Sequence, residues 1–155
     1  MATTPFDDID RKLLALLQED DRLSLAELSA AVGAPASTLS DRVKRLTRQN
    51  VISGFHAQLD PEALGLNLLA FVLVAWSDAK VEPIFRERIK ASPAVLECHH
   101  VTGVWNYLLK VRVKTTRDFE AFLSNVVKSI EGVQRTETII VLSSLKESSA
   151  LDTSA

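Results

Sequence analysis

Residues 23–49 constrain the fold more than any other stretch, because they have the pattern of two short helices joined by a tight turn. Ser24 and Glu27 have the Ser-x-x-Glu spacing of a capping box, in which each side chain accepts a backbone N–H of the other residue. Gly33 can adopt the left-handed conformation that closes a helix, and Pro35 suits the first turn of the helix that follows. The pattern predicts a helix–turn–helix pair.

The second of these helices has one apolar and one polar face. Leu39, Val43 and Leu46 repeat at i, i+4 and i+7, which is the spacing of a buried face. Hydroxyl side chains can reach base edges or phosphates, and Lys and Arg neutralise phosphate charge, so the polar residues suit the DNA major groove. The candidate DNA-binding residues, most of them expected to point outward, are Ser37, Thr38, Ser40, Asp41, Arg42, Lys44, Arg45 and Arg48. An ordinary solvated helix face has the same pattern, so the flanking segments decide between the two interpretations.

The flanking segments complete a DNA-binding domain. Residues 8–18 have the apolar periodicity of a third helix, with acids in its first turn where the helix dipole favours them. Residues 51–60 read as a small hairpin with a bend at Gly54. Three helices and a hairpin make a winged helix-turn-helix, whose second motif helix enters the major groove. We therefore predict a winged helix-turn-helix domain over residues 1–60.

Composition narrows the class of protein. The chain has 155 residues, 46% of them hydrophobic and 25% charged, which is ample for the cores of one or two small domains. Its single cysteine, Cys98, excludes an internal disulfide and fits a reducing compartment. No apolar leader opens the sequence, and the run at residues 68–76 is too short for a membrane helix, so we expect a cytoplasmic protein with no membrane partner. The net charge of −2 argues against a general nucleic-acid coat, but residues 34–59 carry a local excess of cations.

The pattern changes after residues 61–65, which read as a linker. Apolar periodicity then predicts six elements in the order β-α-β-β-α-β, at residues 66–76, 81–91, 95–101, 107–113, 116–130 and 133–146. This order is that of the ferredoxin-like split βαβ unit, so the fold class is α+β. We assign the second domain to residues 66–147 and expect residues 148–155 to be a disordered tail.

The sheet of this unit is expected to bury both faces. Two helices cover one face only, yet residues of both parities are apolar in the strands at residues 66–76 and 138–142. A merely hydrophobic sheet would leave a large apolar patch in water, which soluble monomers avoid. A second copy of the chain is the economical cover, so we predict a homodimer.

An enzyme is the competing interpretation, since ferredoxin-like domains also support catalysis and fold alone does not settle function. The candidate groups are Glu97, Cys98, His99, His100 and Glu137. Successive residues of a strand point to opposite faces, so only Cys98 and His100 of the central three could converge. No further Cys/His pair has metal-ligand spacing, so we predict no metal, cofactor or catalytic site. A pure scaffold would leave the basic helix unexplained.

Taken together, the two halves resemble one family, the Lrp/AsnC (leucine-responsive, or feast/famine) regulators. The first half carries D-x-x-D-R-K-L-L at residues 7–14, D-R-L-S-x-x-E-L at 21–28, R-V-K-R-L at 42–46, V-I-S-G-F at 51–55 and L-D-P-E-A-L-G at 59–65. The second half carries V-L-E-C-H-H-V-T-G at residues 95–103, Y-L-L-K-V at 107–111 and T-x-T-x-x-V-L at 136–142. The resemblance runs in unbroken order from about residue 6 to residue 146.

This resemblance implies a sequence-specific, DNA-binding transcriptional regulator whose C-terminal RAM-type domain binds a small effector, commonly an amino acid, at subunit contacts. It also implies dimers that assemble further, often to octamers. The effector-site residues carried over from the family are Gly103, Trp105, Asn106, Tyr107, Thr136 and Thr138.

The chain departs from the family pattern at two positions. Ala34 stands where the family usually has a serine that caps the recognition helix, so we expect a looser helix start. Asn106 stands where the family commonly has an aspartate near the ammonium group of the effector. Because a neutral amide binds an ammonium less strongly than a carboxylate does, either the ligand differs or its binding is weak or absent. Trp105 could stack on a ligand or pack against a neighbouring subunit.

Overall fold

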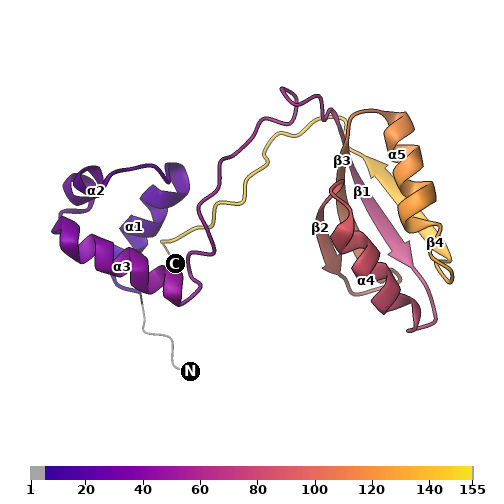
Figure 1. Ribbon diagram of the computed structural model, residues 1–155, viewed down its shortest axis with the longest axis horizontal. Helices are drawn as coiled ribbons and strands as arrows, with labels where there is room; N and C mark the ends of the chain where they lie inside the picture. The colour runs from indigo at the N-terminus through magenta and orange to yellow at the C-terminus, as the bar shows by residue number, and fades with distance from the viewer. Residues whose placement is uncertain (1–5, 155) are drawn as a thin grey trace. The chain divides into compact units, whose positions relative to one another are not determined.

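The structure is a computed structural model that describes residues 6–154 (Figure 1). The chain divides into two compact units, and each is described by itself. The first contains the chain up to Gln58 together with the segment from Glu147 onward, and the second runs from Leu59 to Lys146. Residues 1–5 and 155, which the sequence assigns to the first domain and to the tail, lie outside the described residues.

The first unit is built from α1 (Asp8–Glu19), α2 (Leu25–Val32) and α3 (Ala36–Arg48). Each helix turns an apolar face inward, and the buried apolar side chains are those of Leu13, Leu28, Ala34, Leu39 and Leu46. Because each helix must bury its apolar face, this shared core holds the three helices together as one unit. The predicted helix-turn-helix is confirmed.

The turn chemistry predicted for this unit is also present. The Ser24 hydroxyl accepts from the backbone N–H of Glu27 at 3.2 Å, and the Glu27 carboxylate accepts from the Ser24 N–H at 2.8 Å. Gly33 closes α2 with φ of 79°, in the left-handed region. Pro35 is the N-cap of α3 and not its first helical residue, and no side chain caps this helix. The cap position expected at Ala34 is therefore one residue too early, and the looser helix start stays a prediction.

The predicted hairpin after α3 is wrong in detail. Residues 51 and 52 form a bend, and residues 53–60 contain neither a strand nor a turn, so no two segments pair as a hairpin. Phe55 and Leu59 are exposed at 46% and 67%, so the apolar residues of this segment lack the buried face that would hold a hairpin in one register. The correction concerns the hairpin alone: three helices are present as predicted, and residues 53–60 after them have no regular secondary structure.

The C-terminal segment contacts the first unit, in contrast to the disordered tail expected from the sequence. The side-chain amide of Gln18 donates to the Leu151 carbonyl at 3.0 Å, and its carbonyl accepts the Leu151 N–H at 2.7 Å. Arg11 donates to the carbonyl oxygen of Thr153 at 3.0 Å. Because these bonds use backbone groups of the tail, the amino-acid composition of residues 148–155 gave no indication of them.

The second unit is a four-stranded antiparallel sheet covered by helices on one face (Figure 1). Its elements are β1 (Leu68–Ala75), α4 (Val81–Ala91), β2 (Val95–His100), β3 (Tyr107–Val113), α5 (Thr116–Phe122), η1 (Leu123–Val127) and β4 (Arg135–Ile140). The strand order is β2-β3-β1-β4. Antiparallel pairing in this order is that of the split βαβ unit, so the predicted ferredoxin-like fold is confirmed.

The two faces of the sheet differ in what covers them. On the helix-covered face the core contains Val72 and Val74 of β1 and Leu109 and Val111 of β3, each fully buried. The opposite face carries Phe71 and Leu73 of β1, which pair with Ile139 of β4 and Leu108 of β3 respectively. Ile139 is 50% exposed in the single chain. An apolar stripe therefore runs across the centre of this bare face.

Charged side chains border that stripe. Lys110 of β3 lies opposite Phe71 and donates to Glu97 of β2 at 3.1 Å, while Glu137 of β4 lies opposite Leu73.

Across residues 6–154, none of the helices combines the length and the apolar character that a membrane span requires.

Candidate functional site

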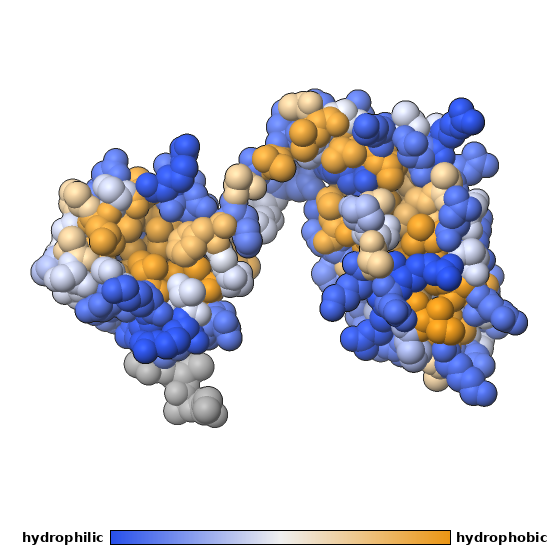
Figure 2. Space-filling view, viewed as in Figure 1, coloured by the Kyte–Doolittle hydropathy of each residue, from blue (hydrophilic) through white to orange (hydrophobic). Residues whose placement is uncertain are grey.

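The predicted DNA-binding residues are distributed around α3, and hydrophilic residues gather over this helix in Figure 2. Five of them are exposed, namely Ser37, Thr38, Asp41, Lys44 and Arg48, whereas Ser40, Arg42 and Arg45 are half-buried. Lys44 lies 3.9 Å from Asp41 across one helical turn, with side chains that are 73% and 82% exposed. Such exposed pairs hold their charges weakly, so Lys44 is free to contact another anion.

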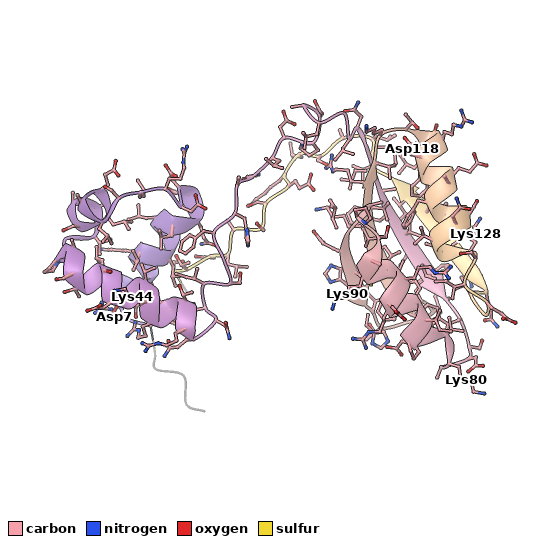
Figure 3. All side chains as sticks on the ribbon, viewed as in Figure 1. Asp7, Lys44, Lys80, Lys90, Asp118 and Lys128 are labelled. Carbon is pink, nitrogen blue, oxygen red and sulfur yellow. The ribbon has the colours of Figure 1, made fainter. Side chains whose placement is uncertain are left out.

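Arg42 and Arg45 have a different environment, because both guanidinium groups are bound to carboxylates at the start of α1. Nη1 of Arg42 donates to both oxygens of Asp7 at 2.7 Å and to Oδ1 of Asp10 at 2.8 Å. Nη2 of Arg45 donates to Oδ2 of Asp10 at 2.5 Å. Figure 3 labels Asp7 beside α3, where Lys44 is also labelled. The expectation that Arg45 points outward with the other polar residues is therefore wrong.

Asp10 is the centre of this cluster, with only 1% of its surface exposed. A buried carboxylate is costly unless it is paired, and here two cations of α3 neutralise it. Asp7 is also the N-cap of α1, and its pKa is lowered, first by the backbone N–H of Asp10 and then by Arg42. The hydrogen bonds of Arg42 to the Asp7 and then the Asp10 side chain raise the pKa of Arg42, so Asp7 and Arg42 both stay charged.

The sequence contained a signal for this cluster that helix-dipole reasoning missed. Asp7 and Asp10 are three residues apart at the start of α1, and Arg42 and Arg45 are three residues apart in α3. Residues at i and i+3 share one helix face, so two acids on one helix match two cations on the other. Matching spacings of opposite charge would have predicted the contact.

The predicted effector residues meet at one end of the sheet. Val74 of β1 pairs with Tyr107 of β3 on one side and with Thr136 of β4 on the other, so these three residues form a row across the sheet. Thr138 lies one row further along, opposite Val72. Gly103, Trp105 and Asn106 belong to the loop that enters β3 at the same end. The structure thus brings five of the six residues together, with Thr138 as their neighbour along β4.

Asn106 fastens this loop to the sheet. Its side-chain carbonyl accepts the backbone N–H of Trp76 at 2.8 Å, and its own N–H donates to the carbonyl of Val74 at 2.9 Å. Its carbonyl accepts the N–H of Val101 at 3.0 Å. Because an N–H requires an acceptor, the oxygen of the amide faces Trp76 and the NH₂ group points away from it. Asn106 therefore offers a hydrogen-bond donor to its surroundings, not the acceptor assumed for an ammonium.

Aromatic side chains surround the same end of the sheet. The guanidinium carbon of Arg135 lies 4.5 Å from the centroid of the Trp105 ring. This is a cation–π contact between β4 and the loop. Trp76 stacks on Tyr107 with centroids 5.6 Å apart, and His100 stacks on Tyr107 at 4.9 Å. Arg135 did not appear among the sequence candidates, since a cation at a strand start carries no pattern of its own.

An open groove of about 730 Å³ is lined by residues of α4 and β2. Of the six effector candidates Tyr107 lines it, together with Glu82, Arg86, Cys98 and His100. The Tyr107 hydroxyl donates to Glu82 at 2.7 Å, and burial, followed by this bond, raises the Tyr107 pKa. The groove therefore adjoins the loop site and does not contain it.

The groups proposed for an enzyme do not assemble into a reactive site. Cys98 is exposed, but partial desolvation raises the pKa of its thiol, and this favours the protonated form over the nucleophilic thiolate. Glu97 binds His99 at 3.2 Å and Lys110 at 3.1 Å on the bare face, and these bonds, that to His99 first, lower its pKa. Among the described residues no three His, Cys, Asp or Glu side chains are placed to hold a metal ion.

Comparison with known proteins bears on both units. Residues 6–53 match a family model described as winged helix-turn-helix DNA-binding, and residues 69–151 match one described as the Lrp/AsnC ligand binding domain. The HTH-type transcriptional regulator FL11 of Pyrococcus furiosus is 39% identical over 94% of this chain and 95% of its own length. The proline dehydrogenase transcriptional activator of Rhizobium radiobacter is 36% identical over 94% of each chain.

Solved structures agree with these matches. A transcriptional regulator from Neisseria meningitidis, determined as its L-Met complex, superposes with a TM-score of 0.91 at 32% identity over 95% of this chain and 96% of that one. AsnC of Escherichia coli gives a TM-score of 0.88 at 26% identity over 95% and 99%. A helix-turn-helix unit joined to a ligand-binding ferredoxin-like unit defines a transcriptional regulator, not an enzyme, so the alternative interpretation is not supported. The chain belongs to the Lrp/AsnC family.

Proposed function

We propose that the protein binds specific DNA sites through the exposed side of α3, with Ser37, Thr38 and Asp41 facing base edges and Lys44 and Arg48 facing phosphates. The observation that carries this proposal is the exposure of these five side chains beside half-buried neighbours on the same helix. Hydroxyl groups near the start of the helix suit base contacts, and cations further along suit the DNA backbone. With DNA as its partner, the protein acts in the cytoplasm.

Electrophoretic shift assays over a range of salt concentrations test this assignment. Lys44→Ala should weaken binding to every duplex alike and flatten the salt dependence, because the slope of log K against log salt falls by about 0.9 for each phosphate that is no longer neutralised. Lys12→Ala, which removes an exposed lysine from α1 in the same unit, is the matched control and should leave the slope unchanged. An unchanged slope for Lys44→Ala would place the DNA elsewhere.

We further propose that a second copy of the chain covers the bare sheet face to form a homodimer, the building block of a larger assembly such as an octamer. The support is the apolar stripe of Phe71, Leu73, Leu108 and Ile139 with charged residues at its border. An apolar centre within a polar rim is the arrangement of a stable protein interface. In a dimer two α3 helices would be available for the two halves of a pseudo-palindromic site.

The effector is proposed to be an amino acid or a related small metabolite that binds near residues 103–107, Thr136 and Thr138. The Neisseria relative, solved with L-Met, supports the class of ligand. The Asn106 amide, whose oxygen is bound to Trp76, presents its NH₂ group and so favours an acceptor such as a carboxylate at this position. Trp105 and Arg135 supply an aromatic surface and a cation beside it.

A further inference from the structure

We propose that Asp10 is a positioning residue for DNA recognition, because it holds two cations of α3 away from the phosphate backbone. This inference rests on the proposed use of α3 as the DNA-contacting helix. Four cations lie on α3, and the buried Asp10 carboxylate binds two of them, Arg42 and Arg45. Asp10 thereby divides the basic residues of the helix into a withheld pair and a free pair.

The charges of the cluster balance. Arg42 and Arg45 contribute two positive charges, and Asp7 and Asp10 contribute two negative charges within direct hydrogen-bonding distance. The side chains of Arg42 and Arg45 are only 20% and 32% exposed, whereas that of Lys44 is 73% exposed. A guanidinium that already donates to a buried carboxylate would have to leave it unpaired in order to reach a phosphate.

The consequence concerns specificity and not only affinity. Phosphate contacts add affinity to all DNA sequences alike. Each contact contributes about 0.9 to the slope of log K against log salt, so it changes the binding constant about 3.5-fold between 50 and 200 mM salt. Base contacts alone discriminate between sequences. Withholding two cations reduces the binding free energy that all DNA sequences share. The base contacts then supply a larger share of the total, and the protein discriminates more strongly between sequences.

The decisive experiment is a double-mutant cycle of Asp10→Asn and Arg45→Gln in the full-length protein. Binding is measured over salt concentration on a random-sequence duplex and on a duplex selected by the wild-type protein from random sequences. Asp10→Asn should release Arg45, steepen the slope by about 0.9 for each α3 on the DNA, and lower the ratio of selected to random binding at least threefold. Arg45→Gln alone should leave the wild-type slope unchanged, and in the double variant it should cancel the steepening.

Matched variants show whether a changed slope comes from the release of a cation, from the altered net charge or from loss of folding. Asp8→Asn removes the same charge from an exposed position in the same turn of α1 and should leave slope and ratio as in the wild type. Asp10→Ser also removes the carboxylate that binds Arg45 and gives a second reading if Asp10→Asn does not fold. Asp7→Asn keeps a side chain suited to N-capping and leaves Arg42 bound to Asp10, so it should leave the slope unchanged. A merely structural role would reduce binding in Asp10→Asn without steepening the slope.

Three results would overturn the inference: an unchanged slope in folded Asp10→Asn and Asp10→Ser, a flattened slope in Arg45→Gln alone, or equal effects of Asp8→Asn and Asp10→Asn. Failure of the proposed DNA face itself would be seen separately, as an unchanged slope in Lys44→Ala with the Asp10 variants still binding.

Discussion

The side-chain carbonyl of Asn106 accepts the backbone N–H of Trp76 at 2.8 Å and so joins the loop before β3 to the end of β1. This bond gives Asn106 a structural role before any ligand is considered. Two variants of this residue distinguish the structural role from the proposed ligand contact.

Asn106→Ala should destabilise the protein by about 1–3 kcal/mol, because the partly buried N–H of Trp76 would lose its acceptor. Urea unfolding followed by circular dichroism measures this change. Asn67→Ala, at an exposed position before β1, serves as the control and should change the free energy of unfolding by less than about 0.5 kcal/mol. Equal stabilities of the two variants would remove the structural role of the Asn106 side chain.

Asn106→Asp should keep the bond to Trp76 and exchange the free donor for a negative charge. We expect free α-amino acids to gain affinity by about 1 kcal/mol or more, since a carboxylate binds an ammonium more strongly than a neutral group does. Calorimetric titration of both proteins with a panel of amino acids, beginning with methionine, tests this. Tight binding of a small amino acid such as alanine by the native protein would refute the proposed preference, because the neutral amide would then suffice.

The capping box of α2 should make stability depend on pH. Hydrogen bonds from the Ser24 hydroxyl and backbone N–H lower the pKa of Glu27 below its ordinary value near 4.5. A lowered folded-state pKa contributes stability above the unfolded value, and this contribution is lost as the pH falls through the folded value. Glu27→Gln should therefore weaken the pH dependence of the free energy of unfolding between about pH 5 and pH 3. Glu19→Gln, at an exposed position near the end of α1, should leave this pH dependence unchanged.

Gly132 occupies a position that only glycine fits. Its φ is 94°, and a Cβ there would overlap Cγ2 of Val81, a buried and stiff side chain. Gly132→Ala should destabilise the protein by about 2–4 kcal/mol, from backbone strain and overpacking together. Gly103→Ala, with φ of 103° and open space around the added Cβ, should cost about 1–2 kcal/mol from strain alone. A smaller loss in thermal unfolding for Gly132→Ala than for Gly103→Ala would contradict this account.

The proposed dimer predicts opposite outcomes for two isoleucines of similar exposure. Ile139, 50% exposed on the bare sheet face, should be buried against the second copy, so Ile139→Asp should shift the assembly toward monomer in analytical ultracentrifugation. Ile84, 54% exposed on α4, lies on the other side of the unit, and Ile84→Asp should leave the assembly unchanged. Dissociation by both variants or by neither would count against the sheet face as the interface.

The success of sequence reasoning here follows the range of the interactions. The capping box of Ser24 and Glu27 and the closure of α2 at Gly33 depend on neighbours within four residues, so spacing alone predicted them. The strand order followed from the succession of apolar periods, because few topologies accommodate it.

Features that depend on distant partners were missed or only partly predicted. The bonds of Asp10 span more than 30 residues to Arg42 and Arg45, and the bonds of Gln18 to Leu151 use backbone groups that no composition reveals. The hairpin expected at residues 51–60 failed for a related reason: a bend at a glycine does not make a hairpin without a surface on which its strands can pack.

The placement of aromatic residues around Asn106 also gives the protein a built-in optical probe. The chain contains two tryptophans, Trp76 stacked on Tyr107 and Trp105 under Arg135, and both lie where the loop before β3 meets the sheet. The emission of an indole depends on its immediate neighbours, so the whole tryptophan signal reports on this one corner of the molecule. Titrations with unlabelled metabolites can therefore be followed by intrinsic fluorescence, and Trp105→Phe would isolate the contribution of Trp76.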